Sequence, residues 1–540
     1  MKTDLGKEVL EAFLKLCDEL KFDDVEEIHH QLEAFRGVFK EKGIKPKQTM
    51  WIVRGAITGR TRGADIGVII SVLGKNRVVE RVKKIYNSYT NQTEEFVPID
   101  GKKVKMYVCG PTVYDYAHLG HARCYITWDM VVRYLRFRGY DVTYARNITD
   151  VDDKIIARAQ KEGTTPSVIS KKYAEEFEKS MAALNVLSPD VEPLATQNIQ
   201  EMIAIVKKLQ DDGFAYEVDG DVYFRVKKFP KYGMLSNQSI KDLEAGARVE
   251  ASDKKEDALD FALWKSAKEG EISWPSPWGH GRPGWHIECS AMARKYLAPT
   301  IDIHAGGQDL LFPHHENEIA QSECAFKVPF AKYWMHNGFV TINKEKMSKS
   351  LGNFVTINKL LESYDADTIR FFILTNHYRM PVEFNDEALT SAKAGVKRLK
   401  NAVVDLKEYA GDDLAVDLES DEAKAFVEAM DDDFNTSRSM AILFDLATKA
   451  QKAKNSDDKK ELGRSFALLV HLSDVLGFSL DKSKSGDNKL VDSLMALILD
   501  IRKNARQEKN WALSDKIRDE LAASGVILKD TKDGTSWIIE

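Results

Sequence analysis

Two histidines and two glutamates lie close together in FPHHENEIAQSEC, residues 312–324, a segment predicted to be helical. His314 and Glu318 are four residues apart, so they share one face of such a helix and could bind the same metal ion. The zinc-protease pattern H-E-x-x-H is absent, because Ile319 occupies the position of its second histidine. A solvated acidic helix start is the alternative, and this stretch alone does not decide between the two.

A second candidate site is the string HLGH, His118 to His121, which follows a predicted strand and begins a predicted helix. A helix N-terminus presents free N–H groups and the positive end of the helix dipole, which together favour a phosphate group. Two histidines that flank a glycine can approach a triphosphate closely. A pattern of four residues is not specific by itself.

The string KMSKS, Lys346 to Ser350, places two lysines and two serines in a predicted loop, where they could bind a pyrophosphate leaving group. Negative charge on the leaving group grows in the transition state, so flexible lysine charges stabilise it most there. The string alone is also compatible with a solvated loop. HLGH after the first strand together with KMSKS after the last is a specific combination, which favours the nucleotide-binding interpretation.

The composition is that of a large globular protein, with 43% hydrophobic and 30% charged residues. A length of 540 residues predicts about three or four domains. No apolar run approaches the ~20 residues of a membrane span, and the charged N-terminus MKTDLGKEVLEAF lacks the apolar core of a signal peptide. We therefore expect a cytoplasmic protein. The net charge of −6 excludes a globally basic nucleic-acid binder.

The chain contains five cysteines, an odd and sparse number that argues against a disulfide framework. Most of them are expected to be small buried hydrophobic residues, and one or two could be metal ligands. The five are Cys17, Cys109, Cys124, Cys289 and Cys324.

The segment from residue 103 predicts an α/β fold with a Rossmann-like, doubly wound parallel sheet. KVKMYVCGP and YDVTYARNIT are predicted strands, and the helix CYITWDMVVRYLRFRG between them ends at Gly139. Strand, helix and strand in this order form a βαβ unit, whose ligands bind beyond the carboxyl ends of the strands. Cys109 and Thr149 lie at such ends.

Other segments fill in the domain organisation. Residues 166–250 predict helices and a strand pair, and the sheet is expected to resume with GWHIECSAM and TIDIHAGGQD. From about residue 391 a helical bundle follows, and the polar stretch 481–489 separates it from a small C-terminal domain. The predicted domains are residues 1–92 (a helical extension and linker), 93–340 (catalytic, with an insertion at about 190–275), 341–390 (the KMSKS-loop region), 391–480 (the bundle) and 486–540 (C-terminal, anticodon-binding).

The N-terminal extension begins with amphipathic helices, and residues 87–102 are predicted to be a polar linker. One helix face is expected to carry Val25, Ile28, Leu32, Phe35 and Val38. Between Lys40 and Lys84 twelve lysines and arginines accompany three acidic residues, which is compatible with RNA contact or with a solvated surface.

HLGH and KMSKS together resemble the signatures of class I aminoacyl-tRNA synthetases, which activate an amino acid with ATP and transfer it to tRNA. Longer strings are similar to those of cysteinyl-tRNA synthetases, and the resemblance covers about residues 95–540. One departure is Leu119, where that family has isoleucine. The strings are VCGPTVYDYAHLGHAR, NITDVDDKI, ALDFALWKSAKEGEISWPSPWGHGRPGWHIECSAM, DIHAGGQDLLFPHHENEIAQSE, KMSKSLGN and NWALSDKIRDELAASGVILKDTKDGTSW.

The resemblance implies one zinc ion per chain in the amino-acid pocket, with the sulfur of the substrate as an added ligand. Thiolates, an imidazole and a carboxylate suit Zn²⁺. A cysteine thiolate binds zinc far better than a serine hydroxyl does, so zinc can reject serine and no editing domain is needed. The implied ligands are Cys109, Cys289, His314 and Glu318.

The same resemblance assigns the other site residues. Catalytic roles are implied for His118, His121, Lys346 and Lys349. ATP, with Mg²⁺ as its companion ion, is expected to bind these residues together with Gly120 and Ser348. The pocket for the body and ammonium group of cysteine is implied to contain Thr149, Trp285, His304 and Asp309.

The implied partners are tRNA(Cys), L-cysteine and ATP, with no membrane, and the chain is expected to be a monomer. Two alternatives stay open: a ligase that joins cysteine to an amino-sugar, and an inactive tRNA-binding paralogue. The helical C-terminal segment IRKNARQEKNWALSDKIRDEL favours tRNA over the amino-sugar. The segment KQTMWIVRGAITGRTRGADIGVIISVLGKNRVVERVKKI faintly resembles the C-terminal anticodon-binding region of glutamyl-tRNA synthetase.

Overall fold

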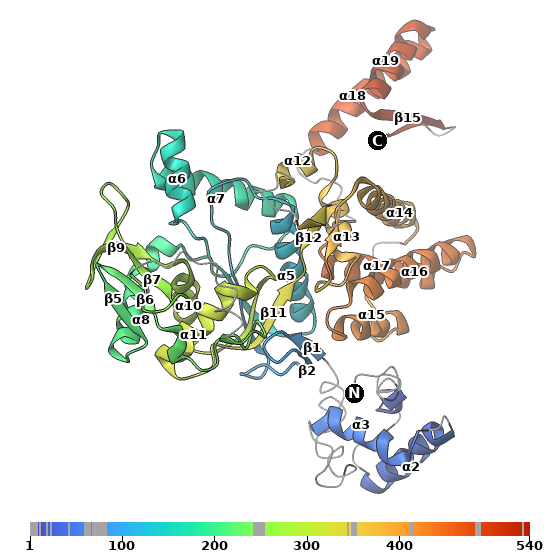
Figure 1. The fold of residues 1–540 in the computed structure, drawn as a ribbon. Coiled ribbons are helices and arrows are strands. Elements are labelled where there is room, and N and C mark those ends of the chain that lie inside the picture. The colour runs from blue at the N-terminus through green and yellow to red at the C-terminus, as the bar shows by residue number, and fades with distance from the viewer. Residues whose placement is uncertain are drawn as a thin grey trace. The chain divides into compact units, whose positions relative to one another are not determined.

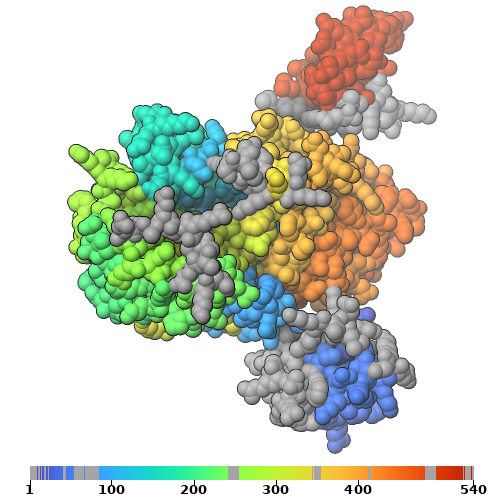
Figure 2. All heavy atoms as spheres, viewed as in Figure 1, coloured from blue at the N-terminus to red at the C-terminus, as the bar shows by residue number. Residues whose placement is uncertain are grey.

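The chain forms two compact units, Met1–Phe478 and Ser479–Glu540, in a computed structural model. Figure 1 shows the elements, and Figure 2 shows the same view with all heavy atoms as spheres. The described residues are 9, 12–13, 15–17, 20–21, 24–41, 44–58, 66, 84–240, 254–342, 345–346, 354–410, 415–480, 488–531 and 534–539. No helix in this described part of the chain has the length and apolar character needed to cross a membrane.

A four-stranded parallel sheet forms the centre of the first unit, and it confirms the predicted α/β fold. Its order is β11-β10-β3-β4. Every residue of β10 is buried, as expected for a strand of a parallel sheet that is covered on both faces. The strands are β3 (Lys103–Val108), β4 (Asp141–Arg146), β10 (Ile301–Gly307) and β11 (Ala331–Asn337).

Helix α5 (Leu119–Phe137) connects β3 to β4 and packs against the sheet. His118 is its N-cap, and the His118 and His121 side chains both accept backbone N–H groups in a capping box. Gly139 follows the helix with a φ of 79°, a left-handed conformation that glycine adopts without strain. The βαβ unit is therefore as the sequence predicts.

The insertion forms a separate five-stranded antiparallel sheet, seen in green beside the central sheet in Figure 1, with the order β5-β6-β7-β9-β8. The helices between β4 and β7 in the chain are α6 (Asp153–Glu162), α7 (Pro166–Ala183), η1 (Ala195–Asn198), α8 (Ile199–Asp211) and η2 (Val226–Lys228), of which α8 packs against the insertion sheet. The strands are β5 (Ala215–Val218), β6 (Asp221–Phe224), β7 (Phe261–Ser266), β8 (Trp274–Ser276) and β9 (Gly279–Pro283).

The segment GWHIECSAM is a helix, α10 (Trp285–Tyr296), so the prediction of a strand there is wrong. Residues 287–293 are all buried. A fully buried helix lacks an exposed face, and its apolar pattern is then indistinguishable from that of a buried strand. The segment TIDIHAGGQD does return to the sheet as β10. Helix α11 (Glu316–Phe326) follows the turn η3 (Leu311–His315).

Residues 87–102, predicted to be a linker, instead dock on the catalytic sheet. A hairpin forms at the start of this segment: β1 (Lys84–Asn87) ends at its first residue, and β2 (Gln92–Glu95) lies within it. The backbone N–H of Ser88 donates to the carbonyl of Trp334 at 2.8 Å. The backbone N–H of Ile99 donates to Asp302 Oδ1 at 2.6 Å. Because the backbone of this polar segment is paired with the sheet, its polarity does not make it a free linker.

Helices dominate the rest of the first unit, which confirms the predicted bundle. A small sheet, β13-β12-β14, precedes the bundle. Its elements are β12 (Val340–Ile342), β13 (Glu345–Lys346), α12 (Ile357–Leu361), α13 (Ala366–Leu374) and β14 (Val382–Glu383). The bundle helices are α14 (Asp386–Ala410), α15 (Asp421–Asp431), α16 (Thr436–Asn455) and α17 (Lys459–Val475).

The second unit contains α18 (Asn488–Gln507), α19 (Trp511–Ala523) and the hairpin β15 (Val526–Thr531) with β16 (Gly534–Ile539). Most of the stretch 481–489 lies outside the described residues.

The N-terminal extension contains α2 (Val25–Glu41) and α3 (Pro46–Thr58) around a core of its own. Ile28, Leu32 and Phe35 are buried as predicted, but Val38 is 54% exposed and Phe39 is buried in its place. Phe39 follows Phe35 by four residues and Leu32 by seven, and this helical spacing places Phe39, not Val38, over the core. Most of the basic run from Lys40 to Lys84 lies outside the described residues.

A buried ion pair joins helix α5 of the catalytic domain to helix α13, which precedes the bundle. Arg370 Nη1 on α13 lies 2.7 Å from Asp129 Oδ2 on α5, and both side chains are almost wholly buried. Arg370 also donates to the carbonyls of Leu184, Asn185 and Leu476. The guanidinium therefore satisfies three backbone acceptors as well as one carboxylate.

Arg370→Met should lower the free energy of unfolding by roughly 3–5 kcal/mol, because it removes one of the two arginine partners of the buried Asp129 carboxylate and the Arg370 donors of three backbone carbonyls. Thermal and denaturant unfolding of the purified chain measure the effect. Arg138→Met is the matched control, since Arg138 lies 3.5 Å from Asp431 in a partly exposed pair and should cost much less. Equal losses in the two variants would contradict a central role for the buried pair.

Candidate functional site

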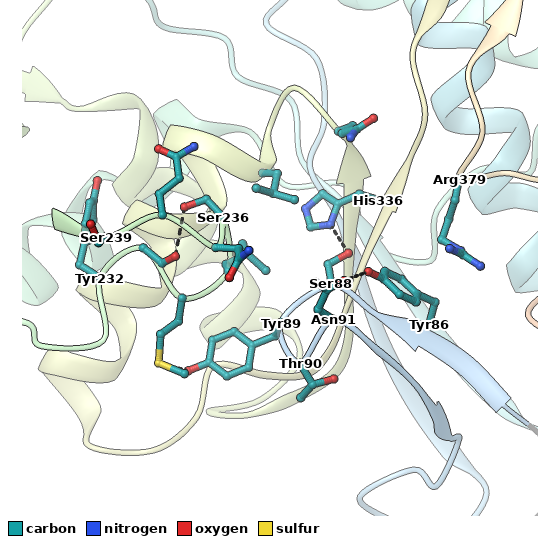
Figure 3. Close-up of a pocket in the computed structure, with 17 residues that line it drawn as sticks. Tyr86, Ser88, Tyr89, Thr90, Asn91, Tyr232, Ser236, Ser239, His336 and Arg379 are labelled. Carbon is teal, nitrogen blue, oxygen red and sulfur yellow. Dashed lines mark hydrogen bonds between the residues drawn. The ribbon is translucent and has the colours of Figure 1, made fainter. Parts of the chain in front are cut away.

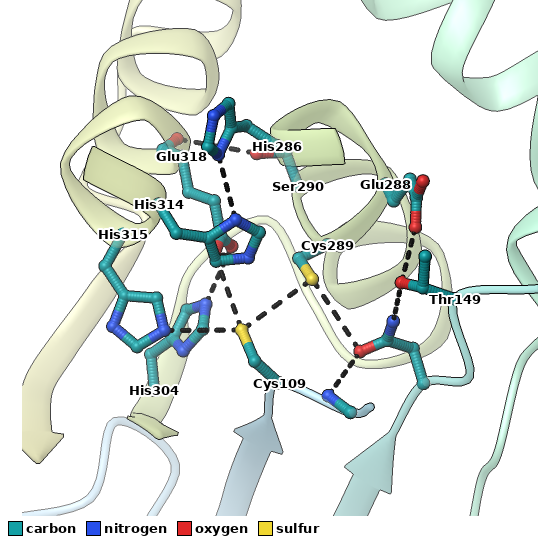
Figure 4. A network of polar contacts seen from close by, with 12 residues as sticks. Cys109, Thr149, His286, Glu288, Cys289, Ser290, His304, His314, His315 and Glu318 are labelled. Carbon is teal, nitrogen blue, oxygen red and sulfur yellow. Dashed lines mark hydrogen bonds and ion pairs between the residues drawn. The ribbon is translucent and has the colours of Figure 1, made fainter. Parts of the chain in front are cut away.

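Four potential metal ligands converge at the carboxyl end of β3. Cys109 follows β3, Cys289 lies on α10, His314 lies in the turn before α11, and Glu318 lies on α11. One donor atom from each lies within 4.8 Å of all the others, and all four residues are buried. Figure 4 shows their side chains pointing toward a common centre. The four elements thus bring together residues that are far apart in the sequence.

The distances within this cluster are short. Cys109 Sγ lies 3.7 Å from Cys289 Sγ and 3.5 Å from Glu318 Oε1. His314 Nε2 lies 3.0 Å from Glu318 Oε1. It is costly to bury thiols, an imidazole and a carboxylate together without a binding partner. A divalent metal ion is a partner that suits all of these groups. The cluster could therefore hold a metal ion.

The electrostatics of the cluster favour the ionised forms of Glu318 and Cys289, whereas for His314 the opposing effect of burial is outweighed, chiefly by the Glu318 charge, and its pKa is raised to about 10. Burial acts to raise the pKa of Glu318, but the charges of His304 and His314 outweigh it and lower that pKa to about 2. Burial likewise opposes ionisation of Cys289, but hydrogen bonds from Cys109 and His314 bring its pKa down to about 6. Burial raises the pKa of Cys109 well above its ordinary value. A metal cation bound in the cluster would stabilise the Cys109 thiolate and so lower the pKa of this thiol.

A second, overlapping donor set uses His304 and His315 with Cys109 and Glu318. His315 Nε2 lies 3.3 Å from Cys109 Sγ, and His304 Nε2 lies 2.8 Å from Glu318 Oε2. The other ring nitrogen of His315, Nδ1, lies 2.8 Å from His336 Nε2. His315 is thus already engaged on both of its ring nitrogens.

The histidine contacts continue to the surface of the molecule. His336 Nδ1 lies 2.8 Å from Ser88 Oγ, on the turn of the β1–β2 hairpin. Both residues line a cavity of about 840 Å³, together with Tyr89, Tyr232 and Arg379. Figure 3 shows His336 and Ser88 pointing toward each other at the edge of this cavity. The burial of His336 lowers its pKa to about 3.

The residues predicted to contact cysteine lie in different environments. Trp285 begins α10, is 38% exposed, and its ring centroid lies 4.1 Å from that of His314. Thr149 follows β4 and is buried. His304 is also fully buried, and its Nε2 lies 2.8 Å from Oε2 of Glu318, one of the four potential metal ligands. Asp309 is exposed in the turn after β10.

The HLGH residues lie at the N-terminus of α5, where the His118 and His121 rings stack with centroids 3.9 Å apart. The segment just after KMSKS is bonded to them, because Leu119 N–H donates to the Val355 carbonyl at 2.9 Å. Only the backbone of Lys346 is described, in β13, and Ser348 and Lys349 lie outside the described residues. The segment that follows KMSKS, from residue 354 onward, is therefore a neighbour of HLGH in space.

Sequence reasoning missed several buried polar residues beside the cluster. His286 Nδ1 lies 2.9 Å from His314 Nδ1, and burial lowers the pKa of His286 well below its ordinary value. Glu288 contacts Thr149. Both residues stand between Trp285 and Cys289 in the sequence, so their proximity to two predicted site residues was the available indication.

The sequence of this chain is similar to those of known aminoacyl-tRNA synthetases. The family described as "tRNA synthetases class I (C) catalytic domain" matches residues 95–394. "Cysteine–tRNA ligase" of Geobacillus sp. (strain WCH70) is 50% identical over 467 residues, which is 84% of this chain and 98% of that protein. "Cysteine–tRNA ligase" of Geobacter sulfurreducens is 48% identical over 478 residues, 85% of this chain and 99% of that protein.

The chain belongs to the cysteine–tRNA ligase family. Its remaining segments match further families: "Anticodon binding domain" at residues 1–86, "DALR domain" at 425–481 and "Cysteinyl-tRNA ligase anticodon binding domain" at 495–537. The first of these matches confirms that the N-terminal extension resembles an anticodon-binding region. The resemblance to the cysteine–tRNA ligase family stated from the sequence is likewise confirmed.

Solved structures agree with this family assignment at the level of the fold. The Mycobacterium tuberculosis methionyl-tRNA synthetase in complex with methionyl-adenylate is 17% identical, with a TM-score of 0.50 over 69% of this chain and 89% of that chain. The Agrobacterium radiobacter K84 agnB2 LeuRS in its ternary complex is 13% identical, with a TM-score of 0.51 over 71% of this chain and 85% of that chain.

Cys289→Ser should abolish binding of a divalent metal ion, whereas His315→Gln should retain it, because only the first variant removes a donor of the set that contains His314. Metal content of the purified variants, measured by atomic emission, tests this. Cys324→Ser is the control, since Cys324 is buried but belongs to neither donor set. Loss of metal in His315→Gln with retention in Cys289→Ser would favour the second set.

Proposed function

We propose that the chain activates L-cysteine with ATP to cysteinyl-adenylate and transfers the cysteinyl group to tRNA(Cys), with one zinc ion selecting the thiol. The observation that carries this proposal is the convergence of Cys109, Cys289, His314 and Glu318 within 4.8 Å, inside a chain of the cysteine–tRNA ligase family. Two thiolates, one imidazole and one carboxylate match the ligand preferences of Zn²⁺.

Several contacts favour this donor set over the one that contains His315. The pKa of Cys289 near 6 makes its thiolate available at neutral pH. His315 Nδ1 is occupied by His336, so His315 is a better support for Cys109 than a ligand. His286 lies against His314 Nδ1, which leaves Nε2 of His314 for the metal.

Zinc, when bound, supplies a soft Lewis-acid site that prefers a thiolate to a hydroxyl. The residues around it fix how an amino acid would enter. Trp285 provides an aromatic wall beside His314. Thr149, His304 and Asp309 are proposed to complete the pocket for the body and ammonium group of the substrate, with Asp309 as one partner of the ammonium. A site built for the thiol would then leave serine without its main interaction, a loss large enough to make a separate editing site unnecessary.

Activation of cysteine needs positioning and charge stabilisation rather than a covalent enzyme intermediate. His118, Gly120 and His121 are proposed to bind the ATP phosphates, since they present the N-terminus of α5. Lys346, Ser348 and Lys349 are proposed to stabilise the leaving pyrophosphate, with Mg²⁺ as the companion ion of ATP. The backbone contact between Leu119 and Val355 supports this arrangement, because it anchors the end of the KMSKS loop beside HLGH.

We propose that residues 486–540 read the anticodon and that the bundle, residues 391–480, supports tRNA contact. The family matches at 425–481 and 495–537 support this division. The sequence predicts that the N-terminal extension and its linker span residues 1–92. We propose that the extension ends before Lys84, because the β1–β2 hairpin that begins there is bonded to the catalytic sheet through Ser88 and Trp334. A monomeric chain in the cytoplasm is proposed from the family alone.

A cysteine ligase acting on an amino-sugar and an inactive tRNA-binding paralogue are the competing proposals. The match of the C-terminal residues to an anticodon-binding family favours tRNA as the acceptor. The presence of HLGH, KMSKS and all four proposed metal ligands favours an active enzyme.

Lys349→Ala should slow cysteine-dependent ATP–pyrophosphate exchange by roughly 100- to 1,000-fold, by analogy with loss of one oxyanion donor, while the affinity for cysteine stays unchanged. The reason is that this lysine acts on charge that develops in the transition state. Lys359→Ala is the matched control, because Lys359 is an exposed lysine on α12 outside the motif. A wild-type chain that shows no exchange with cysteine would contradict the proposed activity. A Lys349→Ala variant with weakened cysteine binding and a normal rate would contradict only the role of the lysine.

A further inference from the structure

A line of three hydrogen bonds runs through the buried side of the amino-acid pocket. The backbone N–H of Gly110 donates to Asn147 Oδ1 at 2.8 Å. Asn147 Nδ2 donates to Thr149 Oγ1 at 3.2 Å, and Thr149 Oγ1 donates to Glu288 Oε2 at 2.7 Å. Figure 4 shows Thr149 and Glu288 joined by the last of these bonds. Asn147, Thr149 and Glu288 are each 1% exposed.

The direction of this line is fixed by its first member. A backbone N–H can only donate, so the carbonyl oxygen of the Asn147 side chain must face Gly110 and its NH₂ group must face Thr149. The Thr149 oxygen therefore already accepts one hydrogen bond from Asn147. Its own proton must point elsewhere, and Glu288 Oε2 accepts it. The order of donors and acceptors from Gly110 to Thr149 follows from one backbone N–H, and the last bond has Thr149 Oγ1 as donor and Glu288 Oε2 as acceptor.

Only glycine can stand at the start of the line. A Cβ atom at position 110 would lie 1.5 Å from the backbone carbonyl oxygen of Asn147. The approach of the two backbones that makes the Gly110–Asn147 hydrogen bond possible therefore requires the absence of a side chain.

We propose that Glu288 and Asn147 are positioning residues that hold the Thr149 hydroxyl as a hydrogen-bond acceptor for the α-ammonium group of L-cysteine. A hydroxyl has one donor and two acceptor positions. Asn147 uses one acceptor position and Glu288 takes the donor, so one acceptor position is left. That position suits an ammonium group, which only donates, and rejects a carboxylate, which only accepts. The inference rests on the proposed activation of cysteine at this site.

The location of the acceptor matches a small amino thiol. The Cys289 thiol lies 3.7 Å from Asn147 Oδ1, so the Asn147 amide connects a proposed zinc ligand to Thr149. The nitrogen and sulfur of cysteine are separated by only two carbon atoms, so the substrate needs its ammonium site near its sulfur site. Glu288 itself is buried behind Thr149, and it therefore acts on the substrate through Thr149 alone.

The test compares two thiols that differ in the ammonium group, L-cysteine and 3-mercaptopropionate, which lacks it. Their dissociation constants for the full-length, zinc-loaded chain are measured by isothermal titration calorimetry, with zinc content measured in parallel. Glu288→Leu should weaken L-cysteine by roughly 10- to 100-fold, as expected for disturbing a hydrogen bond to a charged group, and leave 3-mercaptopropionate unchanged. Zinc content should stay at one ion per chain.

Further variants separate positioning from packing. Thr149→Val should give the same selective loss, and the double variant with Glu288→Leu should lose no more than Thr149→Val alone, because both changes remove one interaction. Glu288→Gln keeps an oxygen that can accept the Thr149 proton, and Thr149→Ser keeps the hydroxyl, so both should retain most of the affinity. Ser290→Ala, on the same helix but bonded to Gln321 and not to Thr149, is the control and should leave both thiols unchanged.

Equal weakening of both thiols by Glu288→Leu, or additive losses in the double variant, would overturn the inference and leave the proposed function standing. Failure of the zinc-loaded wild-type chain to bind either thiol would instead contradict the proposed function, and the inference with it. The two failures are thus distinguished by the wild-type measurement.

Discussion

The burial of two thiols, an imidazole and a carboxylate in one cluster is the constraint on which the rest of the site depends. Each of these groups loses solvation when it is buried, and short contacts among them do not replace that solvation unless a cation joins them. The cluster of Cys109, Cys289, His314 and Glu318 could therefore hold a metal ion, which would relieve this cost of burial. Selection of a thiol substrate is the role proposed for such an ion, because a soft-donor site prefers a thiolate to a hydroxyl.

The fold supplies the donors from separate elements and fixes them from behind. Cys109 ends a strand of the central sheet, whereas Cys289 and Glu318 lie on α10 and α11, which pack together. A layer of histidines lies beneath: His304 holds Glu318, and His315 connects Cys109 to His336. The last of these reaches the hairpin at Ser88, so a surface element is connected to the buried cluster.

Sequence patterns predicted the central βαβ unit because its strands and helix have distinct periodicities and end at Gly110 and Gly139. They failed at GWHIECSAM, where burial on all sides removes the periodicity that distinguishes a helix from a strand. They also failed at residues 87–102, where a polar segment pairs its backbone with the sheet. Composition reports polarity, but it does not report which backbone groups are paired across the fold.

The four proposed metal ligands could be named from motifs, because each stands in a string that resembles one family. Their supports could not. His286 and Glu288 act through partners far away in the sequence, His314 and Thr149, and such contacts arise only once α10 packs beside the sheet and the turn before α11. The exposed position of Asp309 and the deep position of His304 likewise depend on packing rather than on local pattern.

Zinc-edge X-ray absorption of the purified chain, with and without substrate, tests the central claim most directly. The account predicts that L-cysteine adds one sulfur neighbour at ~2.3 Å to each zinc ion, and that L-serine at the same concentration does not. An unchanged number of sulfur neighbours in the presence of saturating L-cysteine would contradict the claim that the buried cluster selects the substrate through its thiol.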